Sequence, residues 1–214
     1  MKATELMRHF DPVDAPAGMQ HLLNGVVAPR PIAWVSTWGP NRTANVAPHS
    51  YMTVFNVDPP IVGFVSNGRK DTLNNVEETG AFACNFADFA LAEAMNLTSA
   101  DFPPTVSEFD WAGLTIVEGD AVNAPWVGES PASFECKVVE IQPVPGTSSV
   151  LVLGEVVRIH IADRLWIGDR LDVTALDPVG RTSGSGYTRL GEPFSMKRPT
   201  WKGLQQAGVN PVTE

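Results

Sequence analysis

The clearest indication of the fold is the stretch Pro31-Ile-Ala-Trp-Val-Ser-Thr-Trp38, which is followed by Gly39-Pro-Asn41 and then by a second run from Arg42 to Met52. Aromatic and β-branched residues favour strands. Gly, Pro and Asn favour the turn between two strands. The pattern therefore predicts a β-hairpin over residues 31–52.

Further short apolar runs indicate that this hairpin belongs to a larger antiparallel sheet. The chain has 18 Gly and 18 Pro, which separate the runs as turn residues do in β-rich folds. The run from Pro60 to Ser66 is almost continuously apolar, which is typical of a strand buried on both faces. The sequence Pro143-Val-Pro-Gly146 predicts a turn between the two longest runs. The additional strands that we expect are Pro60–Ser66, Ala81–Phe86, Leu114–Val117, Ala132–Gln142 and Ser148–Ile161.

Two short helices should interrupt the sheet, each begun by an aspartate whose carboxylate can accept hydrogen bonds from the first free N–H groups. A glycine is well suited to end the first helix. Apolar side chains three positions apart in that helix would face the core. The expected elements are a helix from Asp71 to Thr79, ended by Gly80 and with Leu73 and Val76 inward, and a helix from Phe89 to Asn96 capped by Asp88.

Length and composition are those of one globular domain. The 214 residues are 43% hydrophobic and 18% charged, which predicts a single domain over 1–214 with its core at about 25–190. The net charge of −9 disfavours nucleic acid as a partner. No run has the length of a membrane span or a signal peptide, so we expect a cytoplasmic protein without membrane association. Cys84 and Cys136 lack a CxxC spacing and are expected to be buried free thiols, with a disulfide between them left open.

Several common chemical sites are missing from the sequence. It has no GxGxxG after a strand, no GxxxxGK[ST], no GxSxG and no HExxH. The four histidines stand far apart without metal-ligand spacing, which predicts no metal site.

Two polar segments nevertheless suggest a ligand. Arg69-Lys-Asp-Thr72 lies at the start of a predicted helix, where free N–H groups, a lysine and a hydroxyl suit a phosphate. Val35-Ser-Thr37 and Asn45-Val-Ala-Pro-His-Ser50 lie on the two strands of the hairpin and can converge beside a pocket. The alternatives are an ordinary helix start with solvated basic residues and ordinary turn chemistry.

The order of these segments resembles the flavin reductase-like family, which includes flavoredoxin and the small reductase components of two-component monooxygenases. The resemblance covers roughly residues 25–190. It rests on Arg30-Pro-Ile-Ala-Trp-Val-Ser-Thr37, Asn45-Val-Ala-Pro-His-Ser50, Asp58-Pro-Pro60, Lys70-Asp-Thr72 with Asn75, Phe82-Ala-Cys-Asn85 and Gly154-Glu-Val-Val-Arg-Ile-His160.

The resemblance implies an antiparallel Greek-key split β-barrel that binds FMN, usually as a homodimer. It implies phosphate and ribityl contacts from Ser36, Thr37, Lys70 and Thr72. It implies ribityl and ring contacts from Asn45, Ala47 and Ser50, with Asn85 close by.

A catalytic role beside the flavin and the nicotinamide is implied for His160. In an alternating strand, His160 would point away from Ile159 and Ile161 and reach a cleft while they fill the barrel. A hydrogen-bonded barrel histidine is the alternative. The roles of Arg181 and Tyr187 stay open, because Arg181-Thr-Ser-Gly184-Ser-Gly departs from the family's Arg-Leu-Gly-Gly.

The family implies an oxidoreductase that passes a hydride from NAD(P)H to FMN, with a monooxygenase component or another acceptor taking the electrons. Hydride transfer between two cofactors needs no obligatory side-chain acid or base. One alternative is an electron carrier like flavoredoxin, without nicotinamide activity of its own. Another is a barrel for a different planar ligand, such as haem or pyridoxal phosphate.

Overall fold

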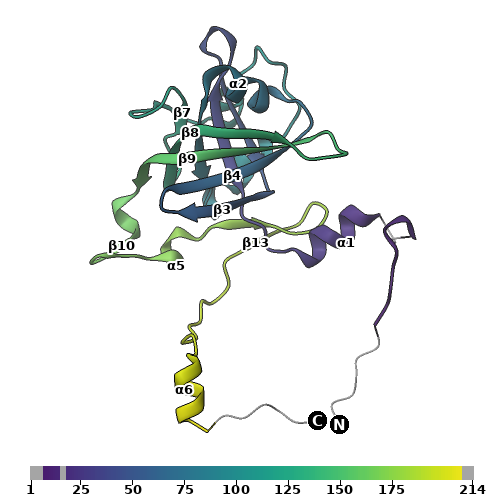
Figure 1. Ribbon diagram of the computed structural model, residues 1–214. Coiled ribbons are helices and arrows are strands. Elements are labelled where there is room, and N and C mark those ends of the chain that lie inside the picture. The colour runs from purple at the N-terminus through teal and green to yellow at the C-terminus, as the bar shows by residue number, and fades with distance from the viewer. Residues whose placement is uncertain (1–6, 15–17, 209–214) are drawn as a thin grey trace.

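The protein is built around one seven-stranded antiparallel sheet (Figure 1). The computed structural model describes residues 7–14 and 18–208. The strands follow the order β2-β1-β5-β8-β9-β4-β3 across the sheet. Their bounds are β1 Ala33–Trp38, β2 Ala44–His49, β3 Met52–Val57, β4 Pro60–Asn67, β5 Ala81–Phe86, β8 Ala132–Pro143 and β9 Ser149–Ile161. The expected mainly β, antiparallel fold is confirmed.

The sheet curls into a split barrel because its two edge strands are neighbours in the sequence. Strands β2 and β3 stand at opposite ends of the strand order, yet only Ser50 and Tyr51 separate them along the chain. Two residues can span only about 7 Å, so the edges must approach each other. The backbone N–H of Val65 on β4 donates to the carbonyl of Tyr51 at 2.9 Å beside this crossing.

The predicted hairpin is present, but its second strand is shorter than expected. Strands β1 and β2 pair antiparallel, with Thr37 opposite Asn45. The expected strand from Arg42 to Met52 was wrong at both ends. Arg42 lies in the turn with a φ of 60°, and at Ser50 the chain crosses to the other edge of the sheet.

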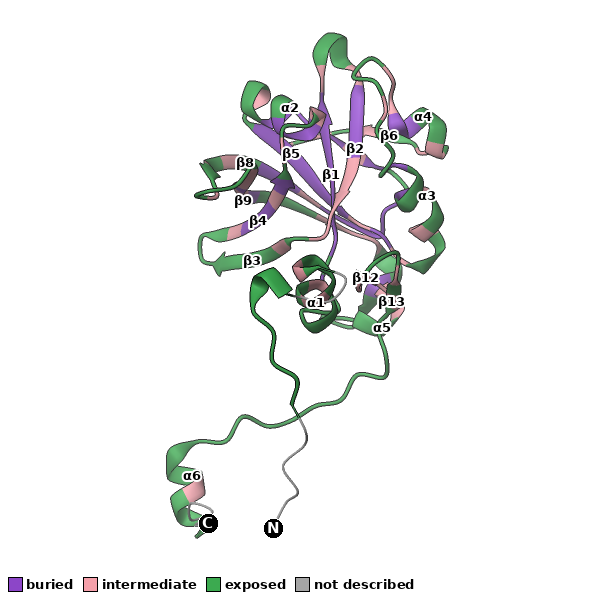
Figure 2. Ribbon diagram, turned by 90° about the vertical axis from the view of Figure 1, so that its right-hand side faces the viewer, coloured by how far each residue is buried: buried purple, intermediate pink, exposed green. Residues whose placement is uncertain are grey.

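Two apolar cores lie on the two faces of the first hairpin (Figure 2). The barrel interior is filled from β1, β4, β5, β8 and β9. A second core packs the opposite face of β1 and β2 against α3 Ala92–Leu97, α4 Glu108–Ala112 and β7 Pro125–Val127. Trp34 and Phe109 are fully buried there, whereas Phe64 and Phe82 are fully buried in the barrel.

The middle of β4 is buried on both faces, because side chains of the neighbouring strands pack closely against its backbone. Val62, Gly63 and Phe64 are buried in succession, as the apolar run predicted. A Cβ atom at Gly63 would lie 2.6 Å from side-chain atoms of both Phe55 and Leu153, so any larger residue would require these side chains to shift.

The two predicted helices occur where expected, with one change in capping. Helix α2, Asp71–Thr79, ends at Gly80 with a φ of 67°, and its Leu73 and Val76 are fully buried. Lys70 occupies the N-cap position instead of Asp71, and no side chain caps this helix. The carboxylate of Asp88 accepts from the Leu91 N–H as predicted, but a 3₁₀ turn at Phe89–Leu91 precedes α3.

Several short elements were not predicted. They are α1 Met19–Val26, β3, α4, β7, β10 Trp166–Ile167, β11 Arg170–Leu171, α5 Val173–Leu176, β12 Val179–Arg181, β13 Tyr187–Arg189 and α6 Trp201–Gln206. The predicted strand 114–117 occurs as β6 Ile116–Glu118, which pairs with β7. Helix α6 ends an extended segment that leads away from the barrel (Figure 1).

Two further findings concern the cysteines and the helices. Cys84 and Cys136 are buried free thiols, which confirms the default expectation for them. Burial raises the pKa of the Cys84 thiol to about 12, so it stays protonated at neutral pH.

Within the described residues, no helix has the length and apolar character needed to cross a membrane.

Candidate functional site

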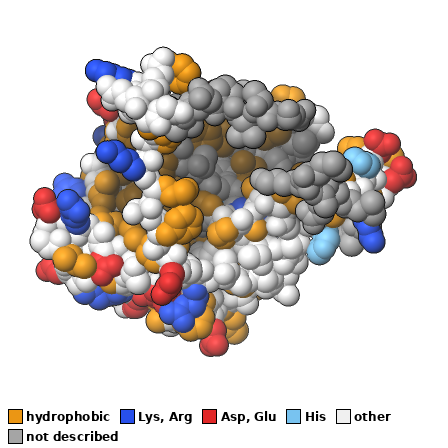
Figure 3. All heavy atoms as spheres, turned by 90° about the horizontal axis from the view of Figure 1, so that it is seen from below, with side chains coloured by type: hydrophobic (Ala, Val, Ile, Leu, Met, Phe, Trp, Pro, Cys, Tyr) orange, Lys and Arg blue, Asp and Glu red, His pale blue; other side chains and the backbone are white. Residues whose placement is uncertain are grey.

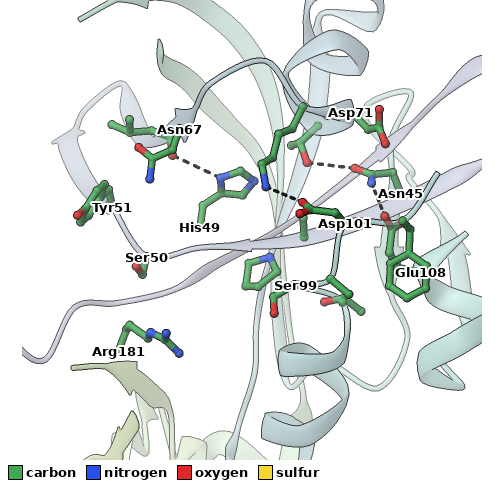
Figure 4. Close-up of a pocket in the computed structure, with 18 of the residues that line it drawn as sticks. Asn45, His49, Ser50, Tyr51, Asn67, Asp71, Ser99, Asp101, Glu108 and Arg181 are labelled. Atoms are coloured by element: carbon green, nitrogen blue, oxygen red, sulfur yellow. Dashed lines mark hydrogen bonds and ion pairs between the residues drawn. The ribbon is translucent and has the colours of Figure 1, made fainter. Parts of the chain in front are cut away.

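A cavity of about 620 Å³ lies beside the crossing from β2 to β3. Its wall combines the end of β2, the start of α2, helix α1, the segment 98–104 after α3, and the loop 181–184. Figure 4 shows labelled side chains around this space from β2, the start of α2, the segment 98–104 and Arg181.

Five of the predicted ligand residues line this cavity together. They come from β2 and the residue after it, and from the first turn of α2: Asn45, Ala47, Ser50, Lys70 and Thr72. The structure therefore brings the two polar segments of the sequence to one place. Their convergence depends on the packing of α2 against β1 and β2.

Three other predicted residues lie behind the wall of the cavity. Ser36 and Asn85 are fully buried, and the Asn85 amide nitrogen donates to Ser36 Oγ at 2.9 Å. Asn85 Oδ1 accepts from the Val127 N–H, while Ser36 Oγ donates to the Pro125 carbonyl. These two side chains therefore hold β7 on the sheet, because alternation along β1 turns Ser36 away from the cavity. The third, Thr37, is also fully buried.

Asn45 is held by hydrogen bonds on both sides of its amide group. Its Oδ1 accepts from the hydroxyls of Thr37 at 3.2 Å and Thr72 at 3.1 Å. Its Nδ2 donates to Glu108 Oε1 at 2.9 Å (Figure 4). Thr37 thus supports a cavity residue from behind.

Lys70 is the cation at the start of α2, and it is paired across the cavity mouth. Its Nζ donates to Asp101 Oδ1 at 2.9 Å, and both side chains are exposed. The hydrogen bond and charge of Lys70 lower the pKa of Asp101. An anion that binds Lys70 therefore competes with Asp101 for the same positive charge.

Two buried polar atoms in the cavity wall have no hydrogen-bond partner in the described part of the chain. They are His49 Nε2 and Arg30 Nε. Burial lowers the pKa of His49 to about 4, so its ring is neutral at neutral pH. His49 Nδ1 lies 3.4 Å from the Val65 carbonyl, an arrangement that leaves Nε2 as a hydrogen-bond acceptor. Unpaired buried polar atoms are costly, so folded proteins keep few of them.

Glu108 is a buried carboxylate in the same wall. Its Oε2 accepts from the Val46 N–H at 3.1 Å. Burial raises the pKa of Glu108, and the nearby charge of Asp71 raises it further, against the opposing effect of the hydrogen bonds.

The structure does not bring His160 to this cavity. Its Nε2 lies 2.7 Å from Glu135 Oε1, and its ring stacks on Trp126 with centroids 4.7 Å apart. Ile159 does not fill the barrel as expected, since it is 53% exposed. Within one chain, His160 matches the alternative of a hydrogen-bonded barrel histidine.

Glu135 ties His160 to a neighbouring loop. Its carboxylate also accepts from the N–H groups of Asp120, Ala121 and Val122. Burial alone would raise the pKa of Glu135, but these hydrogen bonds together lower it. Ligand atoms of Asp120, Glu135 and His160 lie within 4.8 Å of one another, a grouping that histidine spacing does not reveal.

Of the two residues whose roles stayed open, Arg181 lines the cavity and Tyr187 supports it. The Arg181 guanidinium lies 4.4 Å from the centroid of the Tyr187 ring. The Tyr187 hydroxyl donates to Asn96 Oδ1 at 3.0 Å.

Sequence reasoning missed His49, Tyr51, Asn67, Glu108 and the segment 98–104 as parts of the wall. His49 lies inside the polar segment Asn45–Ser50 and could have been found there. Glu108 gave no signal, because it is 63 residues from Asn45 along the chain.

Comparison with known proteins gives a consistent result. Residues 27–171 match a family model described as "Flavin reductase like domain". An uncharacterised protein of Halalkalibacterium halodurans is 39% identical over 189 residues, covering 84% of this chain and 90% of that protein.

Two solved structures extend the comparison. Component B of a nitrilotriacetate monooxygenase from Bacillus cereus is 32% identical, with a TM-score of 0.86 over 90% of this chain and 100% of that one. A Shewanella frigidimarina protein described as having a split barrel domain is 24% identical, with a TM-score of 0.78 over 84% and 91%. The latter supports the split-barrel fold alone.

Proposed function

The chain belongs to the flavin reductase-like domain family, and we propose that it binds FMN in the 620 Å³ cavity and passes a hydride from NAD(P)H to it. One observation carries the proposal. The wall of a single cavity contains both a positively charged helix start and buried polar side chains that lack a hydrogen-bond partner in the described residues. Lys70 stands at the N-cap of α2, and the same cavity is lined by His49 and Arg30, whose buried Nε2 and Nε atoms have no hydrogen-bond partner in the described residues.

The start of α2 suits the phosphate of FMN. The first N–H groups of a helix have no partners within the helix and favour an anion. Lys70 adds a full positive charge, and Thr72 adds a hydroxyl within the first turn. Lys70 exchanges its surface partner Asp101 for the phosphate, which costs little because exposed ion pairs contribute only about 0–1 kcal/mol.

The remainder of the wall suits the ribityl chain and the ring. Neutral His49 offers an acceptor at Nε2, and Asn45 is fixed in orientation by its hydrogen bonds. Ser50 and the backbone at Ala47 complete this side. The residues therefore bind and orient the cofactor and exclude water from one side of it.

When bound, FMN supplies the hydride-accepting chemistry itself. The protein's residues hold the ring in place for the donor, which needs no side-chain acid or base for this step. The electrons then leave to a monooxygenase component or another acceptor. The likeness to component B of a monooxygenase supports this choice of partner.

We also infer a cytoplasmic homodimer. Large apolar side chains are exposed on β3 and β9, among them Val54, Val57 and Ile159. Hydrophobic patches of this kind are typical of association surfaces.

One experiment tests the flavin and the reaction together. FMN and riboflavin are titrated into the protein by flavin fluorescence, and the FMN complex is then mixed anaerobically with NADH or NADPH. We expect FMN to bind more tightly than riboflavin, and its absorbance to bleach with at least one nicotinamide. Equal affinity for the two flavins would contradict the phosphate site. Tight binding without bleaching, together with reduction by dithionite, would favour an electron carrier.

A further inference from the structure

A continuous chain of hydrogen bonds runs from Glu108 to the start of α2. Glu108 Oε1 accepts from the Asn45 amide, and Asn45 Oδ1 accepts from Thr72 Oγ1 at 3.1 Å. A branch leads through Thr37, which donates to Asn45 Oδ1 and accepts from Asn75 Nδ2 at 3.0 Å. All five side chains are buried.

The charge of Glu108 sets the direction of every bond in this chain. An ionised carboxylate only accepts, so it requires the Asn45 NH₂ group to face it. Asn45 Oδ1 must then face the threonines, and the Thr72 hydroxyl is used as a donor to Asn45. In this state the Thr72 proton is used for Asn45 and is not available to a phosphate.

Protonation of Glu108 permits the opposite direction. The new O–H on Oε1 donates to Asn45 Oδ1 after the amide turns over, while Oε2 still accepts from the Val46 N–H. The turned amide donates to Thr72, whose own proton is freed for a ligand. The hydrogen bond between Thr37 and Asn75 can reverse its direction as well. Asn75 is free to turn its amide, because its only side-chain hydrogen bond within the described residues is the one to Thr37.

We propose that Glu108 is a positioning residue, and that a phosphate bound at Thr72 and Lys70 draws one proton from solvent onto Glu108. The proton adds to Oε1, and no bond of the ligand is made or broken. This inference rests on the proposed phosphate site. Besides Glu108, the charged or titratable side chains around the cavity are His21, Arg30, His49, Tyr51, Lys70, Asp71, Asp101 and Arg181.

The pH dependence has a definite sign. The pKa of Glu108 is already raised by burial and by Asp71, and a nearby phosphate raises it further. Between the pKa of the free protein and that of the complex, binding takes up a proton. The Kd of FMN therefore rises with pH in this window, by at most about tenfold per pH unit for one proton.

The test compares the wild type with Glu108→Gln by isothermal titration calorimetry of FMN in two buffers of different ionisation enthalpy. Glutamine mimics the protonated acid, since its NH₂ can donate to Asn45 Oδ1. We expect proton uptake by the wild type to exceed that of Glu108→Gln. At the high end of the window, the variant should bind roughly fivefold or more tightly than the wild type. Asp110→Asn removes an exposed charge from the same helix and should behave like the wild type.

Equal proton uptake by the wild type and Glu108→Gln would overturn the inference, even if their affinities differed. If Glu108→Gln does not fold, infrared difference spectra of the wild type decide instead. FMN, but not riboflavin, should produce the C=O band of a protonated carboxyl group, and its absence would overturn the inference. Failure of the wild type to bind FMN is a separate result, which contradicts the proposed function itself.

Discussion

At the scale of single residues, Lys70 is the most direct test of the phosphate site. Lys70→Ala removes a charged donor at the start of α2, and such a hydrogen bond contributes on the order of 1.5–3 kcal/mol. We expect the Kd of FMN to rise about ten- to a hundredfold, with little change in the free energy of unfolding. Fluorescence titration and urea unfolding measure the two quantities.

The neighbouring Arg69 provides the matched control. Arg69 pairs with Glu77 on the exposed side of α2 and does not line the cavity. Arg69→Ala removes the same charge without touching the site, so it should change the Kd of FMN by less than threefold or so. Equal effects of the two substitutions would mean that only the overall charge of this region matters.

At the scale of elements, Glu135 and His160 join β8 and β9 to the loop 119–122 that precedes β7. His160→Ala removes one hydrogen bond from a buried carboxylate, and this should cost about 1–3 kcal/mol of unfolding free energy. Because His160 lies apart from the cavity within one chain, the affinity for FMN should stay unchanged. Urea unfolding measures the stability, with His9→Ala, at an exposed histidine, as control.

The same variant examines the catalytic role that the family resemblance implies for His160. Anaerobic bleaching of bound FMN should proceed at the wild-type rate in His160→Ala. Unchanged stability combined with a bleaching rate ten or more times slower would contradict this. It would mean that His160 takes part in the reaction, at the cavity of a partner subunit.

At the scale of the whole molecule, we predict that the exposed apolar surface pairs with a second copy of the chain. Hydrophobic patches stand out on the face shown in Figure 3. Val57 on β3 is 81% exposed, and the extended segment before α6 carries Phe194 and Met196, each 82% exposed. Light scattering should therefore give twice the chain mass of 23.1 kDa.

Val57→Asp places a charge on this surface. If Val57 is buried between two copies, the substitution should weaken the dimer roughly a hundredfold, because an unpaired charge would be removed from water. FMN affinity should fall with the dimer. Val13→Asp, at an exposed position near the N-terminus, should leave both unchanged. A wild-type monomer that holds FMN at nanomolar concentration would contradict the dimer.

Local patterns in the sequence were sufficient for the main elements of the fold. The hairpin around Gly39, the buried helix face of Leu73 and Val76, and the long pair β8–β9 all follow from the spacing of apolar residues and turn residues. These features depend on neighbours within a few positions, which is the range over which side-chain periodicity and turn chemistry act. The polar start of α2 could be found for the same reason.

Other features depended on contacts between distant segments. The crossing at Ser50 and Tyr51 exists because the sheet closes on itself, and Glu108 meets Asn45 only after α4 packs on β2. The side on which Ser36, Asn85 and His160 lie follows from the strand register and from the cover provided by β7. No local pattern encodes these choices, since burial and hydrogen-bond partners across the chain decide them. The sequence alone thus determined most strands of the main sheet, helix α2 and the presence of a polar site, whereas the tertiary structure decided which polar side chains face the cavity and which support it from behind.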